Sequence, residues 1–260
     1  MSDSLQAEVL FEQIGTHIAV VTLNRPDVHN AVNGALARKL GAITEQIEGD
    51  PNIRVAVLAA RGPSFCAGMD LKVVAQGGMH EVVIGEAGFA GFVFAPKSKP
   101  WIAAVHGLAL GGGTELALSC DMIVAGKQAQ FGLPEVKRGL IAGAGGCIRI
   151  ARSLPRALAI ELVTTGARLS AERALAFGMA NRLVEPGQEL ATALEIATAI
   201  AEGAPCAVRE TLRLTRYAAD HAEEDALALQ QEAVARVLAS PDLAEGARAF
   251  VEKRAPVWAV

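Results

Sequence analysis

The chain has 260 residues, of which 52% are hydrophobic and 20% are charged, and its formal net charge is -4. This composition can bury a large core and differs from that of a disordered chain, and the length predicts one large domain or one domain with an appendage. A slightly acidic chain without a basic stripe between aromatic residues gives no electrostatic basis for binding nucleic acid.

No apolar run is long enough to predict a membrane-spanning helix, because the longest uncharged run, 100–114, is short and rich in glycine. The first ten residues lack the basic segment followed by an apolar segment that marks a secretory signal. Four widely spaced cysteines without a C-x-x-C pair, and five histidines without an H-x-x-x-H pair, predict reduced core thiols and no structural metal. We therefore expect a cytoplasmic protein with no membrane partner.

The first part of the chain predicts two strands, a helix and a further strand. Residues 17–23 form a β-branched apolar run, and residues 8–13 are expected to pair with it as a hairpin through Gly15. The next segment changes to helical periodicity, which ends before the turn residues at 50–52, and a second buried strand is expected at 53–60. The residues that mark the buried face of this helix are Val32, Leu36, Leu40, Ile43 and Ile47.

A loop follows at 61–72, with small residues before a possible helix for which Asp70 is suited as the N-cap. Residues 73–100 carry the weakest pattern, interrupted by paired glycines. Within this segment, a helix over 81–94 that covers a pocket is the expectation.

The most informative stretch runs from Trp101 to Glu135. The apolar run 101–105 predicts a buried strand, three glycines at 111–113 interrupt it, and a buried helix is expected at 114–118. Glycine has no Cβ and therefore lets a backbone N–H come very close to a ligand. An N–H at the mouth of a helix is suited to an oxygen that carries negative charge.

Helices are expected at 147–153, 155–165 and 170–177, the last with a start signal at Ser170, followed by a short strand at 181–184. From about residue 187 the composition is almost wholly helical, and a broad apolar stripe from 222 onward predicts docking against more than its own subdomain. We therefore expect an α/β core over 1–200 and a helical region over 201–260.

Two carboxylates in the central stretch, Glu115 and Glu135, predict acid–base chemistry. Glu115 has apolar neighbours, so burial should favour its protonated form, whereas Glu135 follows Pro134 at a helix start, where the dipole should lower its pKa. If both face one water, a single proton shared by the pair is the natural state. The alternatives are a core glutamate bonded to backbone and an ordinary helix start, with the glycines serving only close packing.

Other catalytic motifs are missing from the sequence. The glycine triplet does not fit G-x-G-x-x-G, no G-x-x-x-x-G-K-[ST] occurs, and the residues around Ser64 do not form a nucleophile elbow.

The order of several motifs along nearly the whole chain resembles the crotonase superfamily, and within it enoyl-CoA hydratase. The motifs are Asn24-Arg-Pro26 with Asn30-Ala31, Phe65-Cys-Ala-Gly-Met-Asp-Leu71, His106-Gly-Leu-Ala-Leu-Gly-Gly-Gly-Thr-Glu-Leu116, Asp121, Phe131-Gly-Leu-Pro-Glu135 with Gly145-Gly146, and a tail Phe250-Val-Glu-Lys-Arg254 with Pro256 and Trp258.

This resemblance implies a spiral core of ββα units and a helical tail that builds homotrimers, usually paired into hexamers. It implies an acyl-CoA thioester substrate whose carbonyl oxygen is held by the backbone N–H groups of Met69 and Gly112. Glu115 and Glu135 match the glutamates that activate water and handle the α-carbon proton. The implied reaction is syn hydration of a trans-2-enoyl-CoA to a 3-hydroxyacyl-CoA, with no metal and no redox cofactor.

Residues beside these donors are implied to contact the substrate, namely Ala67, Gly68, Asp70, Leu71, Lys72 and Gly111. Lys72, Phe250 and Lys253 resemble positions that approach the CoA moiety, the last two from a neighbouring subunit. The alternative is that the two lysines are solvated surface charges and that the Phe250 ring packs within the tail. The Met69 side chain is expected to crowd the pocket.

Four other functions stay open: double-bond isomerisation, dehydration of a carnitinyl-type thioester, a lyase step, or acyl-CoA binding without catalysis. The presence of both acids and of the glycine donors favours hydration.

Overall fold

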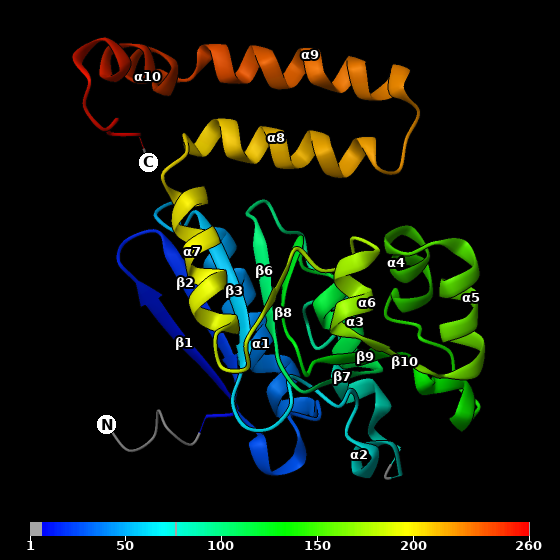
Figure 1. Cartoon of the computed structure of the whole chain (residues 1–260). Coiled ribbons are helices and arrows are strands. Elements are labelled where there is room, and N and C mark those ends of the chain that lie inside the picture. Colours follow the sequence, from blue (N-terminus) through cyan, green and yellow to red (C-terminus); the bar gives the residue numbers. More distant parts are fainter. Residues whose placement is uncertain (1–6, 76, 260) are drawn as a thin grey trace.

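The computed structural model describes residues 7–75 and 77–259, which form an α/β core and a helical arm (Figure 1). A six-stranded sheet in the order β1-β2-β3-β6-β8-β11 organises the core. β1 and β2 form the predicted hairpin through Gly15, and the other neighbouring strands pair in parallel. The strands are β1 (Val9–Ile14), β2 (Ile18–Leu23), β3 (Val55–Ala60), β6 (Trp101–Val105), β8 (Met122–Gly126) and β11 (Arg182–Val184).

Apolar side chains cover both faces of this sheet, which is why its central strands read as continuous apolar runs. Helix α1 (Gly34–Gly49) packs on one face with the predicted stripe buried. Helix α7 (Glu189–Ala201) covers the other face and contacts β3, β6 and β8. Cys66 is buried in the larger core cluster, and the four cysteines are free thiols.

A second, smaller sheet gives the core its spiral form. β9 (Gln130–Gly132) lies between β7 (Leu108–Leu110) and β10 (Arg168–Ser170), and β7 and β9 are parallel. Parallel bridges from Cys66 to Ala109 and from Val32 to Met69 continue the same pattern. Each turn of the chain thus adds one strand to the large sheet, one extended segment to the small sheet and then a helix, which confirms the predicted spiral of ββα units.

The turns of this spiral place two glycine-rich segments side by side. The N–H of Cys66 donates to Leu108 O at 3.0 Å, and the N–H of Leu110 donates to Cys66 O at 3.0 Å. Consequently residues 67–69 lie next to the start of α3 (Gly112–Leu118), which is the buried helix that the sequence predicts.

The predicted helix over 81–94 is wrong. The segment instead holds short 3₁₀ turns at Gly78–Val82 and Gly85–Ala87 and a two-stranded hairpin of β4 (Val83–Ile84) and β5 (Gly88–Phe89). Four residues in it have positive φ, which an α-helix of L-residues does not tolerate. These residues are Gly85, Gly88, Ala90 and Gly91.

The remaining predicted elements are confirmed within a residue or two. The carboxylate of Asp70 accepts the Lys72 N–H at 3.1 Å at the start of α2 (Leu71–Ala75). The hydroxyl of Ser170 accepts the Arg173 N–H at 3.3 Å and caps α6, as its start signal predicts. The helices after the central stretch are α4 (Gly146–Ser153), α5 (Arg156–Thr165) and α6 (Ala171–Ala176).

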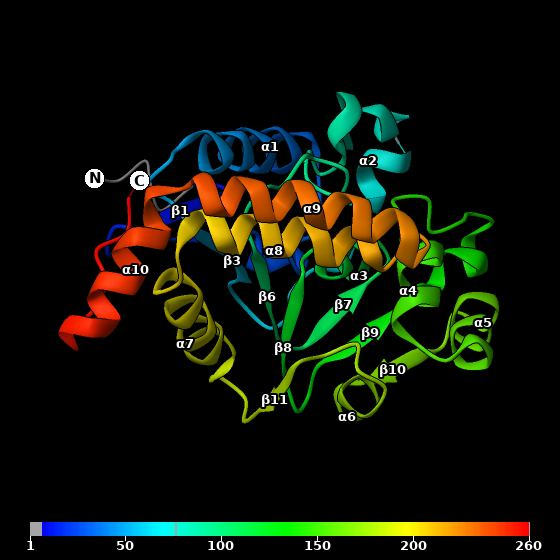
Figure 2. The same cartoon turned by 90° about the horizontal axis from the view of Figure 1, so that it is seen from above.

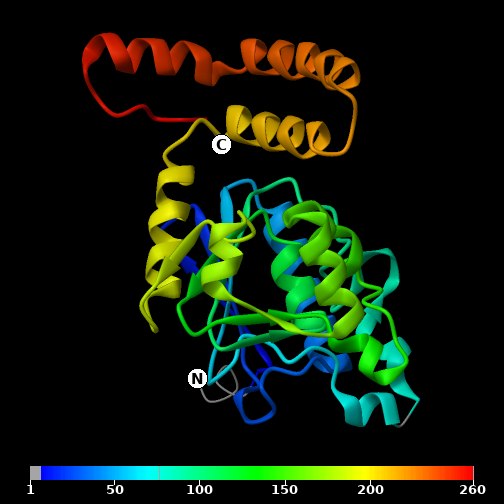
Figure 3. The ribbon, with the colours of Figure 1, turned by 45° about the vertical axis from the view of Figure 1, so that its right-hand side comes forward.

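Beyond α7 the chain leaves the core as an arm of three helices (Figures 1 and 3). They are α8 (Pro205–Ala218), α9 (Glu223–Ala239) and α10 (Pro241–Glu252). Helices α8 and α9 run side by side above the core (Figure 2). The Arg216 guanidinium ties α8 to the core, because its Nη2 lies 2.8 Å from Asp121 Oδ2 and its Nη1 donates to Lys97 O.

The apolar stripe of the arm is only partly covered within one chain. Ala226 and Ala233 are buried, whereas Leu227, Val234 and Leu238 are exposed. The predicted division at residue 200 and the assembly into homotrimers or hexamers stay predictions. Among the described helices, none alone is long and apolar enough to cross a bilayer, and only α7 and α8 taken together, bent by 112°, pass that test.

Candidate active site

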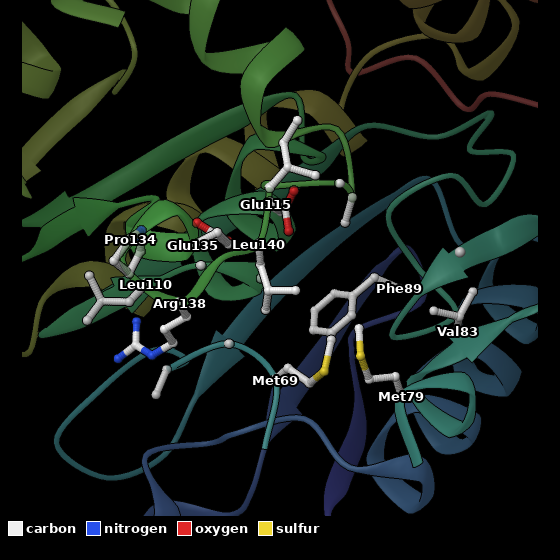
Figure 4. A pocket seen from close by; sticks show the side chains of 18 of the residues that line it. Met69, Met79, Val83, Phe89, Leu110, Glu115, Pro134, Glu135, Arg138 and Leu140 are labelled. Carbon is white, nitrogen blue, oxygen red and sulfur yellow. The ribbon is translucent and has the colours of Figure 1, made fainter. Parts of the chain in front are cut away.

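A cavity of about 330 Å³ opens where the two glycine-rich segments meet (Figure 4). Its floor comes from the 67–71 loop and the start of α3, and its other walls come from the 79–94 segment and from residues 134–144. The lining side chains labelled in Figure 4 are Met69, Met79, Val83, Phe89, Leu110, Glu115, Pro134, Glu135, Arg138 and Leu140.

Both predicted carboxylates line this one cavity. Glu115 projects from α3 and is only 4% exposed, and its Oε1 accepts the Gly146 N–H at 2.9 Å. A Cβ added at Gly146 would lie 2.9 Å from that oxygen, so glycine is needed for this approach.

Glu135 lies in a single 3₁₀ turn, η4 (Pro134–Arg138), with Pro134 at its first position as predicted. Its Oε2 is buried and has no hydrogen-bond partner among the described residues. A buried carboxylate oxygen without a partner is costly, so its place at the wall of a cavity favours a polar ligand there.

Burial raises the pKa of Glu115 to about 7, and the nearby charge of Glu135 adds to this effect, although the Gly146 N–H opposes it. Burial also raises the pKa of Glu135, so the expectation of a lowered value is wrong. The physical reason is that a single 3₁₀ turn supplies only a small dipole. The increase in pKa from desolvation therefore exceeds the decrease that the Glu135 N–H and the Arg138 charge cause.

The raised pKa of Glu115 predicts a pH-dependent stability. The folded state holds this proton up to about pH 7, whereas the unfolded chain releases it near 4.5. The free energy of unfolding should therefore lose about 3 kcal/mol from this group as the pH rises from about 4 to about 8. Urea titrations of the wild type and of Glu115→Gln at several pH values measure this loss. The variant should lack the part of the loss that comes from Glu115. If the unfolding free energies of the two proteins change in parallel with pH, the raised pKa of Glu115 is contradicted.

Two backbone N–H groups are available at the floor of the cavity. The N–H groups of Met69 and Gly112 donate no hydrogen bond to any described residue, whereas the Gly111 N–H is bonded to Gly132 O at 2.8 Å. The Ala67–Met69 loop approaches α3 closely, because a Cβ added at Gly68 would lie 3.0 Å from Gly112 N. Two free donors on adjoining backbone segments form a suitable site for an oxygen that gains negative charge.

The structure places some of the other predicted contact residues at the cavity and others elsewhere. Ala67, Gly68, Leu71 and Gly111 line it. Asp70 does not line it, because its carboxylate pairs with Arg25 at 3.2 Å and caps the turn that begins α2.

Three further predicted contacts lie outside the cavity of a single chain. Lys72 is exposed beside the pocket-lining Leu71. Phe250, 85% exposed, and Lys253 are at the end of α10 and do not line the cavity, and Figure 1 shows α10 in the arm, away from α2 and α3. Substrate contact by these residues stays a prediction.

Sequence reasoning missed most of the apolar wall and one cation. Met79, Val83, Phe89 and Phe94 come from the segment without clear periodicity. Arg138 could have been found, because it follows Glu135 by three positions on the same turn.

Arg149 links the two walls that surround Glu115. Its Nη1 donates to Ala144 O at 3.0 Å, and its Nη2 donates to Val93 O at 2.6 Å. It therefore joins the 79–94 segment to the loop whose Gly146 N–H bonds Glu115, and its positive charge lowers the pKa of that carboxyl.

The fold and the cavity together define an α/β protein of the ββα-spiral type, with a pair of carboxylates facing two free backbone donors. The family model described as "Enoyl-CoA hydratase/isomerase" matches residues 13–260. The chain therefore belongs to the enoyl-CoA hydratase/isomerase family, the crotonase superfamily.

Individual relatives agree with this assignment. The chain is 42% identical over 248 residues to mevalonyl-coenzyme A hydratase of Aspergillus fumigatus, covering 93% of this chain and 91% of that protein. It is 38% identical over 244 residues to carnitinyl-CoA dehydratase of Proteus mirabilis, covering 92% and 93%. A crystal structure of enoyl-CoA hydratase from Mycobacterium tuberculosis matches with a TM-score of 0.93 and 46% identity, covering 98% of this chain and 99% of that one.

Proposed function

We propose that the protein adds water to a trans-2-enoyl-CoA and forms a 3-hydroxyacyl-CoA. The observation that carries this proposal is the arrangement of Glu115 and Glu135 on one cavity with the free N–H groups of Met69 and Gly112. The names of the relatives, which are hydratases and a dehydratase of acyl-CoA thioesters, support the same class of reaction.

In the proposed reaction, the thioester oxygen accepts hydrogen bonds from Met69 N–H and Gly112 N–H. These donors draw electron density from the conjugated double bond and stabilise the enolate oxygen as water attacks the β-carbon. Donors of this kind contribute about 3 kcal/mol each to transition-state stabilisation in other enzymes.

The two carboxyl groups carry out the proton transfers. A new C–O bond forms at the β-carbon, the π electrons move toward the thioester oxygen, and the α-carbon then takes a proton. The pair accepts one proton from water and gives one to the α-carbon, so its total protonation is unchanged after each turnover. A pair with raised pKa values is suited to share one proton near neutral pH.

The alternatives have less support from the site. An isomerase needs only one of the two acids, and a non-catalytic binder needs neither the acids nor the free donors, yet all of them are present. The cavity bears a cation, Arg138, and this would repel the quaternary ammonium group of a carnitinyl thioester. The proposed steps need neither a metal nor a redox cofactor, because the two carboxyl groups transfer the protons and the backbone N–H groups stabilise the enolate oxygen.

The proposal is tested by following the absorbance of the conjugated thioester for trans-2-enoyl-CoA substrates of increasing acyl length. We expect the absorbance to fall and the 3-hydroxyacyl-CoA product to appear. If the product instead has a shifted double bond, the reaction is isomerisation and not hydration. If the protein binds acyl-CoA but does not turn it over, it is a binding protein.

A further inference from the structure

A second cavity, of about 340 Å³, adjoins the first and is strongly basic. The two cavities share Leu110, Pro134 and Arg138. Lys137 and Arg168 also line the second cavity, which has no acidic lining residue among the described residues. Three cations therefore surround one depression directly beside the candidate active site.

None of these three side chains forms an ion pair with a carboxylate in the part of the chain that the structure describes, although the Arg138 charge acts on the nearby Glu135. Lys137 Nζ donates to Gly166 O at 3.0 Å, and Arg168 Nη1 donates to Gln130 Oε1 at 3.0 Å, so both partners are neutral. The Arg138 guanidinium makes neither a hydrogen bond nor an ion pair with any residue in 7–75 or 77–259. Three cations that converge in a concave site, with one carboxyl group beside them, produce a net positive potential that attracts an anion.

Arg138 lies on the same turn as Glu135, the carboxyl group that the proposed function places against the acyl carbons, and both line the first cavity. Glu135 and Arg138 are three positions apart on the 3₁₀ turn η4, and side chains at this spacing lie on the same side of such a turn. The charge of Arg138 also lowers the pKa of Glu135, which shows that the two groups are close enough to interact. In Figure 4, Arg138 lies beside Leu110, on the opposite side of the cavity from Phe89 and Val83.

We propose that Arg138, supported by Lys137 and Arg168, binds an ionised acid group on the acyl chain, so that the substrate class is an acyl-CoA with a second, free carboxylate. This inference rests on the proposed function for the placement of the thioester. The planar guanidinium can donate two parallel hydrogen bonds to a carboxylate. The phosphates of CoA are the other source of anionic oxygen, but the acyl carbons rather than the nucleotide must lie against Glu135.

The test compares two saturated thioesters that cannot be hydrated, adipoyl-CoA and hexanoyl-CoA, by calorimetric binding to the full-length protein. Adipoyl-CoA should bind roughly 10- to 100-fold more tightly, the range expected for a charge-assisted bidentate contact. In Arg138→Gln this difference should disappear, and Arg138→Lys should restore part of it. The control is Arg156→Gln, which removes an exposed charge from α5 outside both cavities and should leave the difference intact.

Pantetheine thioesters of the same two acids, which lack the nucleotide phosphates, separate the two sources of anion. Retention of the adipoyl preference in this pair confirms recognition of the acyl carboxylate. Three results would overturn the proposal. The first is equal affinity of the wild type for the two acyl groups, and the second is a preference for the adipoyl group that survives in Arg138→Gln. The third is a loss of affinity in Arg138→Gln that occurs only with the CoA thioesters and is equal for both acyl groups. Because these ligands do not react, the result stands apart from the outcome of the hydration assay.

Discussion

Glu115→Gln and Glu135→Gln should each lower kcat by about 10³-fold or more, because each variant removes one partner of a proton-transferring pair. Glutamine keeps the size of the side chain and one carbonyl oxygen, but it neither takes nor gives the proton. The N–H of Gly146 can still donate to the carbonyl oxygen of a glutamine at position 115, so the local structure should persist. Initial rates with a trans-2-enoyl-CoA, and calorimetric binding of the saturated analogue, measure the two effects separately.

The matched control is Glu195→Gln, which removes an exposed carboxylate from α7 far from the cavity and should not change kcat. If the two glutamates act as one unit, the double variant should be only slightly slower than the slower single variant. Activity within a few-fold of wild type in either single variant would rule out the two-carboxylate mechanism.

Gly68→Ala should lower kcat by about 10²- to 10³-fold through loss of the carbonyl-binding donors. Gly68 has φ +91°, and its added Cβ would lie 2.8 Å from Leu110 O and 3.0 Å from Gly112 N. Both atoms belong to the backbone of residues 110–112, so relief requires that this segment and the Gly68 loop move apart, and these two segments carry the Gly112 N–H and the Met69 N–H.

The control for this variant is Gly49→Ala, at the end of α1, where an added Cβ meets nothing within 4 Å. Gly68→Ala should also lose about 1–3 kcal/mol of unfolding free energy, so kcat is compared at a temperature where circular dichroism shows the variant fully folded. Near-normal kcat in a folded Gly68→Ala protein would show that these two segments do not hold the carbonyl.

Much of the fold could be predicted from the sequence, because periodicity and local signals agree. The stripe of α1, the apolar runs of β2, β3 and β6, and the Ser170 start signal all depend on nearby residues. The apolar residues of the 81–94 segment wrongly suggest a helix, whereas its backbone turns at glycines that pack against distant parts of the chain. The added Cβ of Gly91, for example, would lie 2.8 Å from Gly41 Cα.

The candidate site was predictable in its motifs and less so in its electrostatics. The glycine triplet and the two glutamates located the cavity, since a backbone donor and a carboxylate have local sequence signals. The direction of the Glu135 pKa depends instead on burial by the tertiary fold, which overrides the weak dipole of a single turn. The role of Arg149 likewise depends on bonds to Val93 and Ala144, and only the folded chain brings Val93 to it.

The most direct test of the central claim is the fate of isotopes when wild-type protein acts on a trans-2-enoyl-CoA in D₂O and, separately, in ¹⁸O-labelled water. If carbonyl polarisation and a shared carboxylate pair add water across the double bond, NMR should find deuterium on the α-carbon, and mass spectrometry should find ¹⁸O in the 3-hydroxyl group. Deuterium at carbon without any ¹⁸O in the product would show that the site moves protons but does not add water, and would contradict the account.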